Sequence, residues 1–477
     1  MKEDFDPSFE NNNNEERFVK LEDMFSDSAY YYFDVAEWEG MIEYYLSILK
    51  LDKATKALNF AKNQHPSALE ISLKEAELLS EKNNPHQAII MLKKLEVSFP
   101  FDADIPTLMG EIHSRFAEPL KAINCYKSAL KKCGEEEEFH ILLQISVECQ
   151  NLDKPNQSIY WLKKLIKKYP DNIEGLYEIA MVYEGENQIK KGIEFFNEFI
   201  EQFPYNHHAW FNLGNLHSFN RNLEGALHAY EYSVVSFSEF SSGWFNKGSI
   251  LARLNQFDKA IEAFTVTLEL EGPSAPTYTN IGECYEEVED FARAMEFYQK
   301  ALDNDNQYSD AIDGAASCLY MLDQFDEALA TCEIGLKQLP ERAGLLHTYA
   351  EVCQGLGFFK ESKRAYKKVI KIDSDNWEVF LDYSGMLWEN GQIEDAIEVI
   401  QSGISLQGKV AELNYRAGSY LYMSGDKTGA FNHWNNAYQK SPGLLNQIFD
   451  FNDAFKNDAE IQEFFEQFGN KLQEQQE

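Results

Sequence analysis

The chain has 477 residues, with 79 acidic against 43 basic side chains and a formal net charge of −36. A field of that sign repels nucleic acid and anionic membranes, so it argues against both as partners and favours basic partners or simple solubility. No stretch is apolar enough to span a bilayer, the start lacks the apolar run of a signal peptide, and the seven cysteines show no paired spacing. These features predict a cytoplasmic protein.

The first segment in chain order, residues 1–28, is acidic and polar and includes the run Asn11 to Asn14. Such a composition buries too little apolar surface to offset the entropy lost on folding. We therefore expect a disordered acidic tail, with ordered structure beginning at residue 29.

Small residues then recur at a spacing of 34 along most of the chain, with one step of 36. This first small column consists of Ala54, Ala88, Ala122, Ser158, Gly192, Ala226, Ala260, Ala294, Ala328, Ser362, Ala396 and Ala430. A second small column lies 12 residues upstream, at Ala76, Gly110, Ser146, Ala180, Gly214, Gly248, Gly282, Ala316, Ala350, Ser384 and Gly418. A bulky column follows the first by four residues, at Tyr126, Leu162, Phe196, Tyr230, Phe264, Tyr298, Tyr366, Ile400 and Trp434.

This spacing is typical of stacked helical hairpins. Residues four apart share one helix face, so Ala260 and Phe264 lie one above the other. The small residue lets two helices approach, and the aromatic ring fills the space beside it. Gly or Asn between the helices, as at Asn255 and Gly357, supplies the turn. We therefore predict an all-α fold, an α-solenoid of stacked helix-turn-helix repeats.

The clearest repeat, residues 207–240, has Trp210, Leu213, Gly214, Ala226 and Tyr230. This pattern resembles the tetratricopeptide repeat. The resemblance implies about twelve such units over residues 29–444, forming a right-handed superhelix. It also implies that the first helix of each unit lines a concave groove.

The end of the chain keeps the register only weakly. Phe464 occurs where the small column requires a residue such as Ala. We predict a degenerate terminal hairpin over residues 445–470 that caps the array, followed by a polar tail over residues 471–477.

The sequence has none of the common catalytic, phosphate-binding or metal-binding motifs. There is no phosphate-binding glycine loop and no HExxH, and the ten histidines do not cluster with cysteines. The repeats also occupy nearly all of the sequence. We therefore predict that the protein is not an enzyme and has no catalytic residues, cofactor or metal.

An asparagine column is the main candidate binding feature. Asn212, Asn246 and Asn280 are spaced 34 apart on the predicted inner face. Each amide offers two donors and an acceptor, so the three could hydrogen-bond the backbone of an extended peptide. The column resembles the asparagine ladder of peptide-binding superhelical relatives. Alternatively, these amides bond only one another or water.

Two further features lie beside this column. The aromatic residues Tyr177, Phe211 and Phe245 each precede the column by one position and could line a pocket for a peptide side chain. Alternatively, these rings pack against the neighbouring unit. Glu283 continues the same face and would favour Lys or Arg in the ligand.

The leading functional hypothesis is a non-enzymatic scaffold that holds an extended peptide segment of a partner protein in the concave groove. One alternative is a self-assembling subunit of a larger complex, whose oligomeric state the sequence leaves open. The aromatic-rich termini, residues 30–33 and 464–468, would then be the contact surfaces. A less favoured alternative is a regulatory partner of an enzyme.

Overall fold

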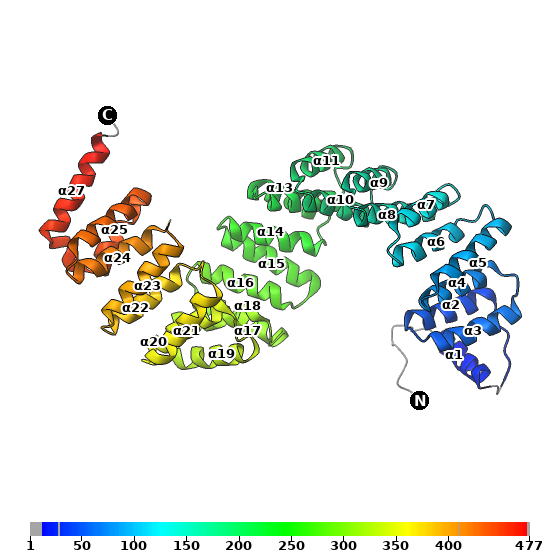
Figure 1. Ribbon diagram of the computed structural model, residues 1–477, viewed down its shortest axis with the longest axis horizontal. Coiled ribbons are helices and arrows are strands. Elements are labelled where there is room, and N and C mark those ends of the chain that lie inside the picture. The colour runs from blue at the N-terminus through cyan, green and yellow to red at the C-terminus, as the bar shows by residue number, and fades with distance from the viewer. Residues whose placement is uncertain (1–11, 27–28, 409, 475–477) are drawn as a thin grey trace. The chain divides into compact units, whose positions relative to one another are not determined.

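Each repeat folds into two helices joined by a tight turn in the computed structural model of the chain (Figure 1). The structure describes residues 12–26, 29–408 and 410–474. Within these residues every regular element is helical. The chain divides into two compact units, Met1–Phe237 and Ser238–Glu477, each with six helix pairs. The prediction of an all-α solenoid is confirmed.

The first unit begins with α1 (Asn12–Phe25). Its helix pairs are α2 (Val35–Ser47) and α3 (Leu51–Gln64), α4 (Leu69–Glu81) and α5 (Pro85–Ser98), α6 (Asp104–Arg115) and α7 (Pro119–Ala129), α8 (Glu135–Asn151) and α9 (Pro155–Lys168), α10 (Ile173–Gly185) and α11 (Ile189–Gln202), and α12 (His207–Phe219) and α13 (Leu223–Ser236).

The second unit continues the same pattern. Its helix pairs are α14 (Ser241–Arg253) and α15 (Phe257–Glu271), α16 (Ala275–Glu287) and α17 (Phe291–Asn304), α18 (Ser309–Met321) and α19 (Phe325–Gln338), α20 (Ala343–Gly355) and α21 (Phe359–Ile372), α22 (Glu378–Glu389) and α23 (Ile393–Leu406), and α24 (Ala411–Met423) and α25 (Lys427–Lys440). It ends with η1 (Pro442–Leu444), α26 (Asn446–Phe451), η2 (Asp453–Asn457) and α27 (Ala459–Glu474).

The turn within each helix pair contains one residue with a positive φ angle. These residues are Leu49, Asn83, Ala117, Asp153, Asn187, Arg221, Asn255, Glu289, Asp323, Gly357, Gly391 and Gly425. Between α14 and α15, the Gln256 N–H donates to the Leu251 carbonyl oxygen at 2.9 Å, which closes the end of the first helix. The left-handed turn predicted from Gly and Asn therefore occurs in all twelve pairs, whatever the residue.

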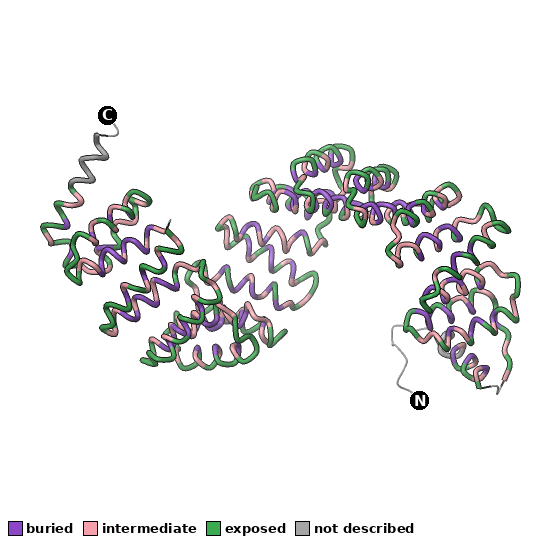
Figure 2. The backbone as a smooth tube through the Cα atoms, in the orientation of Figure 1, coloured by how far each residue is buried: buried purple, intermediate pink, exposed green. Residues whose placement is uncertain are grey.

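The small and bulky columns form the core, seen in Figure 2 as buried stripes along the helices. Ala260 and Phe264 are both 0% exposed. A Cβ added to Gly248 would lie 2.8 Å from the Phe264 ring, so this position of the second small column has no room for a side chain. The predicted close approach of the two helices is confirmed there.

The predicted disorder of residues 1–28 is wrong for residues 12–25, which form α1. Phe18, Leu21 and Met24 form a buried stripe on this helix, and the Phe18 ring lies 4.7 Å from the Tyr44 ring of α2. The polar composition of the whole segment concealed this short apolar face. Residues 1–11 and 27–28 of the predicted tail lie outside the described residues.

The predicted cap at residues 445–470 corresponds to α26, η2 and most of α27. Ile461 is fully buried, and the Phe464 ring stacks on Phe431 of α25 at 4.6 Å. These aromatic side chains therefore cover the last helix pair. Residues 475–477 of the predicted polar tail lie outside the described residues. Among the described helices, none has the length and apolar character needed to cross a membrane.

Candidate interaction groove

A cavity of about 680 Å³ lies in the second unit, along the first helices α16, α18, α20 and α22. We call it the acidic groove. Its lining consists of Glu283, Glu286, Tyr298, Asp310, Asp313, Gly314, Ser317, Tyr320, Met321, Arg342, Gly344, His347, Thr348, Glu351, Trp377, Glu378, Leu381 and Asp382. Seven of these side chains are carboxylates, and Arg342 is the one lining residue with a permanent positive charge.

The repeat period explains why these residues meet. Asp313, His347 and Leu381 are spaced 34 apart, so they occupy one register position on successive first helices. Asp310, Gly344 and Glu378 occupy another. The first helices therefore face the groove, as the family resemblance implied for this part of the chain.

The floor of the groove is tied to the core through Tyr298 of α17. A side chain at Gly314 would collide with the Tyr298 ring, so glycine there lets the ring reach the groove. The Tyr298 hydroxyl donates to Glu286 at 2.7 Å, and Ser317 donates to the other oxygen of that carboxylate at 2.8 Å. Glu286 is thereby held in a single orientation.

Arg342, which immediately precedes α20, pairs with two groove carboxylates. Its Nε donates to Asp313 at 2.6 Å, and its Nη2 pairs with Asp310. Burial raises the pKa of Asp313, although the Arg342 guanidinium counteracts part of that effect. Burial likewise raises the pKa of Glu283, and the nearby charge of Asp310 adds to the rise. The groove is thus deficient in positive charge.

Two neighbouring helices bring His347, Glu351 and Asp382 together. His347 Nε2 lies 2.8 Å from an oxygen of Asp382. Burial raises the pKa of Glu351 to about 7; His347 opposes that rise and Asp382 adds to it. Burial lowers the pKa of His347, but the hydrogen bond to Asp382 and the charge of Glu351 outweigh it, so the net shift is upward. The ligand atoms of these three residues lie within 4.8 Å of one another, close enough to share a cation, although exposed acidic groups commonly lie this close without one.

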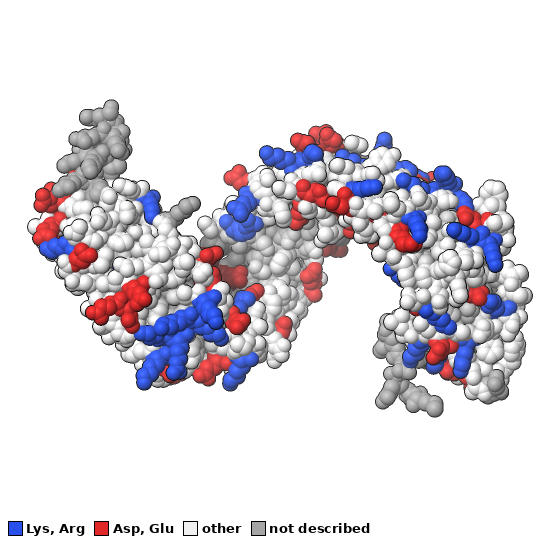
Figure 3. Space-filling model, in the orientation of Figure 1, with Lys and Arg blue, Asp and Glu red and all other residues white. Residues whose placement is uncertain are grey.

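One second helix of this unit, α21, carries a cluster of positively charged side chains. Figure 3 shows basic side chains gathered over α21. Lys360, Arg364, Lys367 and Lys371 form one exposed stripe on this helix. Acidic and basic side chains are therefore segregated between the groove and this outer helix.

Comparison with known families agrees with this architecture. Three models described as tetratricopeptide repeat match residues 174–204, 211–278 and 287–348. The segment from residue 174 to residue 348 therefore contains tetratricopeptide repeats. No match was found among the curated proteins.

Several solved tetratricopeptide repeat structures are similar to the chain. The APC/C hetero-tetramer Cut9–Hcn1 is 10% identical, with 88% of this chain and 98% of that chain covered and a TM-score of 0.42. A tetratricopeptide repeat protein from Parabacteroides merdae is 14% identical, with 51% and 97% covered and a TM-score of 0.44. YrrB, described as having an unusual peptide-binding site, is 19% identical, with 39% and 96% covered and a TM-score of 0.33.

The predicted asparagine column falls in both units, with Asn212 on α12 and Asn246 and Asn280 on α14 and α16. Asn212 is only 2% exposed, and its amide donates to the His208 carbonyl oxygen at 2.9 Å. Asn280 donates in the same way to Pro276 at 2.9 Å. Both donors are therefore directed to their own helices, and peptide contact through this column stays a prediction.

The predicted aromatic residues also have partners in their own repeats. The Phe211 ring lies 5.7 Å from Tyr230, and the Phe245 ring lies 5.6 Å from Phe264. Both rings thus contact the bulky column of their own helix pair. Tyr177 on α10 is half exposed.

Glu283 is the predicted site residue that lines the acidic groove, but most of the groove was missed. The signal was present, because the asparagine column continues as Gly314, Thr348 and Asp382, all of which line the groove. The tetratricopeptide register identified the correct face. At the register position of the column the groove has only one carboxylate, Asp382, and its other carboxylates lie at neighbouring positions of the first helices.

Proposed function

We propose that this protein is a non-enzymatic scaffold whose acidic groove holds an extended basic segment of a partner protein. The observation that carries this proposal is the concentration of seven carboxylates around one cavity with a single permanent cation. Lys or Arg side chains of a partner would neutralise this charge, and Arg342 shows how two groove carboxylates hold a guanidinium. Because the first helices are already arranged around the cavity, binding needs little ordering of the scaffold.

The test uses a dye-labelled peptide of eight alternating lysine and serine residues, followed by fluorescence anisotropy. We expect the full-length protein to bind this peptide and to show no binding of a glutamate–serine peptide of the same length. The variant Asp313→Asn, Glu351→Gln, Asp382→Asn should weaken binding about tenfold, because three ionic contacts of modest strength are lost.

The matched control removes the same number of charges from second helices of the same unit, through Glu327→Gln, Glu333→Gln and Glu394→Gln. These side chains are exposed on α19 and α23. The control should bind like the unmodified protein. Equal weakening in both variants would show that net charge alone attracts the peptide, and no weakening in the groove variant would refute the proposal.

Peptide contact by the asparagine column is a separate part of the proposal. Asn246 and Asn280 occupy the same register position as the groove residues Thr348 and Asp382, two to four repeats earlier. If their amides turn toward a bound segment, they donate to its backbone carbonyl oxygens. Replacing Asn246 and Asn280 by Ala should then weaken, several-fold, the binding of a sixteen-residue lysine–serine peptide. At about 3.3 Å per residue, a peptide of that length can extend from the groove to these two repeats.

The control for this test replaces Asn432 and Asn436 by Ala, because both are exposed on the second helix α25. Circular dichroism should show that both variants keep the helical content of the unmodified protein. An affinity unchanged by the replacement of Asn246 and Asn280 would mean that these amides only stabilise their own helices.

A further inference from the structure

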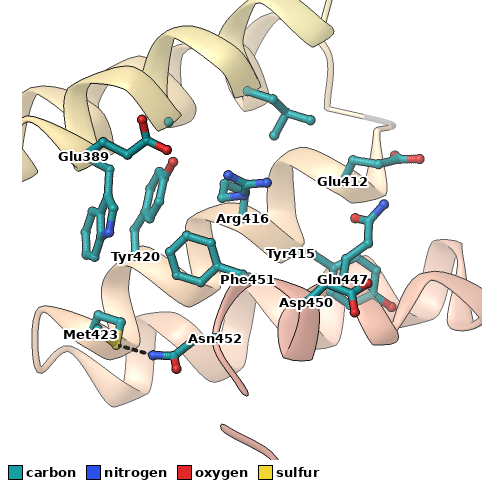
Figure 4. A pocket seen from close by; sticks show the side chains of 13 residues that line it. Glu389, Glu412, Tyr415, Arg416, Tyr420, Met423, Gln447, Asp450, Phe451 and Asn452 are labelled. Atoms are coloured by element: carbon teal, nitrogen blue, oxygen red, sulfur yellow. Dashed lines mark hydrogen bonds between the residues drawn. The ribbon is translucent and has the colours of Figure 1, made fainter. Parts of the chain in front are cut away.

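A second cavity of about 560 Å³ lies beside the acidic groove, between α22, α24 and α26 (Figure 4). We call it the aromatic pocket. Its lining consists of Leu381, Gly385, Trp388, Glu389, Glu412, Tyr415, Arg416, Tyr420, Met423, Gln447, Asp450, Phe451 and Asn452. Leu381 lines both cavities, so the aromatic pocket continues the acidic groove within the second unit.

The floor of this pocket is apolar. The Trp388 and Tyr420 rings are stacked, with centroids 4.5 Å apart and planes at 10°. Phe451 meets both rings edge-on, at 6.0 Å and 5.5 Å. Met423 is 50% exposed, and Asn452 lies against its sulfur at 3.3 Å. Trp388, Phe451 and Met423 thereby present partly exposed apolar surface to the cavity, whereas the Tyr420 ring is fully buried.

The charges around the pocket exclude an acidic occupant. Glu389, Glu412 and Asp450 line it and leave a net negative charge in spite of Arg416. The Arg416 guanidinium lies 5.1 Å from the centre of the Phe451 ring, and Figure 4 shows it among the aromatic side chains. A neutral apolar side chain on a basic segment is therefore favoured here over a carboxylate.

Arg416 also occupies the register position at which other first helices carry groove residues. It lies 34 residues after Asp382, at the register position of the asparagine column. From that position Arg416 lines the pocket, and its guanidinium carries five donors of the kind that a backbone carbonyl oxygen accepts.

We infer that the aromatic pocket seats one large apolar side chain of the same basic segment that the acidic groove holds. This inference rests on the proposed function and adds an anchor residue to it. The anchor side chain packs against Trp388, Phe451 and Met423, and Arg416 donates to the backbone beside it. Neighbouring first helices lie about 10 Å apart and an extended chain spans about 3.3 Å per residue. The anchor therefore lies roughly three to six residues from the nearest bound cation.

The test compares three peptides with the full-length protein: the lysine–serine parent extended by three alanines at each end, and two versions with phenylalanine at either outermost position. We expect one version to bind about tenfold more tightly than the parent, because burying an aromatic side chain is worth about that factor. The tighter version also reveals the direction of the segment.

Single substitutions in the protein test whether the phenylalanine side chain binds in the aromatic pocket. Met423→Ala should remove most of the advantage of phenylalanine and leave the parent peptide unaffected. Leu406→Ala, at an exposed position of α23, should change neither affinity. Trp388→Ala repeats the test at the aromatic floor, with circular dichroism to confirm folding.

The outcomes separate the two ideas. If the parent peptide fails to bind, the proposed function is wrong. If the parent binds but neither phenylalanine version binds more tightly, only the anchor is refuted. A phenylalanine gain that survives Met423→Ala and Trp388→Ala places the anchor elsewhere and also refutes it.

Discussion

At the scale of single residues, the groove is set apart by carboxyl groups whose pKa values are raised by burial, namely those of Glu283, Asp313 and Glu351. Glu351 has a pKa raised to about 7, mainly by burial, with further contributions from Asp382 and Glu378. The pKa of His347 is also raised, through its hydrogen bond to Asp382. The charge of the groove therefore changes near neutral pH, because both groups lose a proton as the pH rises.

This titration predicts that binding of the lysine–serine peptide strengthens as the pH rises from 6 to 8. Deprotonated Glu351 attracts the peptide, each proton lost from His347 acts in the same direction, and lysine stays charged throughout. One carboxylate with a pKa near 7 that must be ionised in the complex yields about a tenfold change. Anisotropy titrations at constant ionic strength measure this effect.

The matched variant is Glu351→Gln, which removes the main titrating group and should flatten the pH profile. Glu333→Gln on the outer face should leave the profile unchanged. A stronger affinity at pH 6 than at pH 8 would contradict the assignment of Glu351 as the titrating contact.

At the scale of the helix pair, the left-handed turn is imposed by the hairpin rather than by the residue in it. Ala117 has φ 55° and Gly391 has φ 71° at equivalent positions. A residue with a Cβ is destabilised in this left-handed conformation by about 1–2 kcal/mol. The pairs that lack glycine therefore store a small strain that the packing of their helices overcomes.

Replacing Ala117 by Gly should raise the free energy of unfolding by roughly 0.5–1 kcal/mol, because the strain relieved exceeds the extra chain entropy of glycine. The reverse change, Gly391→Ala, should lower it by roughly 1 kcal/mol. A Cβ at Gly391 meets no atom within 4 Å, so the loss reports backbone strain alone. Chemical denaturation followed by circular dichroism measures both, and equal stability of the two variants would contradict this explanation.

At the scale of the whole molecule, stability is distributed along the repeats. Helix pairs in such arrays contact mainly the pairs next to them in sequence, so their stabilities add through local interfaces instead of one central core. The chain also divides into two compact units. Unfolding in one cooperative step is therefore not expected.

Denaturant should instead populate partly folded states. The seven tryptophans are spread from Trp38 to Trp434, so fluorescence samples both units, whereas far-ultraviolet circular dichroism reports total helix. We expect the two curves to have different midpoints. Coincident curves at several wavelengths would indicate a single cooperative unit and contradict this view.

The fold was largely predictable because its information is local. A 34-residue period, small residues four positions before aromatic ones and tight turns determine helix pairs through contacts between near neighbours. The exception was α1, where the apolar residues Phe18, Leu21 and Met24 were diluted by polar neighbours. Composition averaged over 28 residues does not detect a face of three side chains.

The sequence by itself determined the repeat, the buried columns and the face of the first helices α16, α18, α20 and α22 that lines the acidic groove. Only the tertiary structure decided the chemistry of that groove. Residues between Glu283 and Asp382 come together from four first helices, and the raised pKa values follow from burial and from carboxylates on neighbouring repeats. Such effects depend on distances across repeats, which a one-dimensional period does not contain.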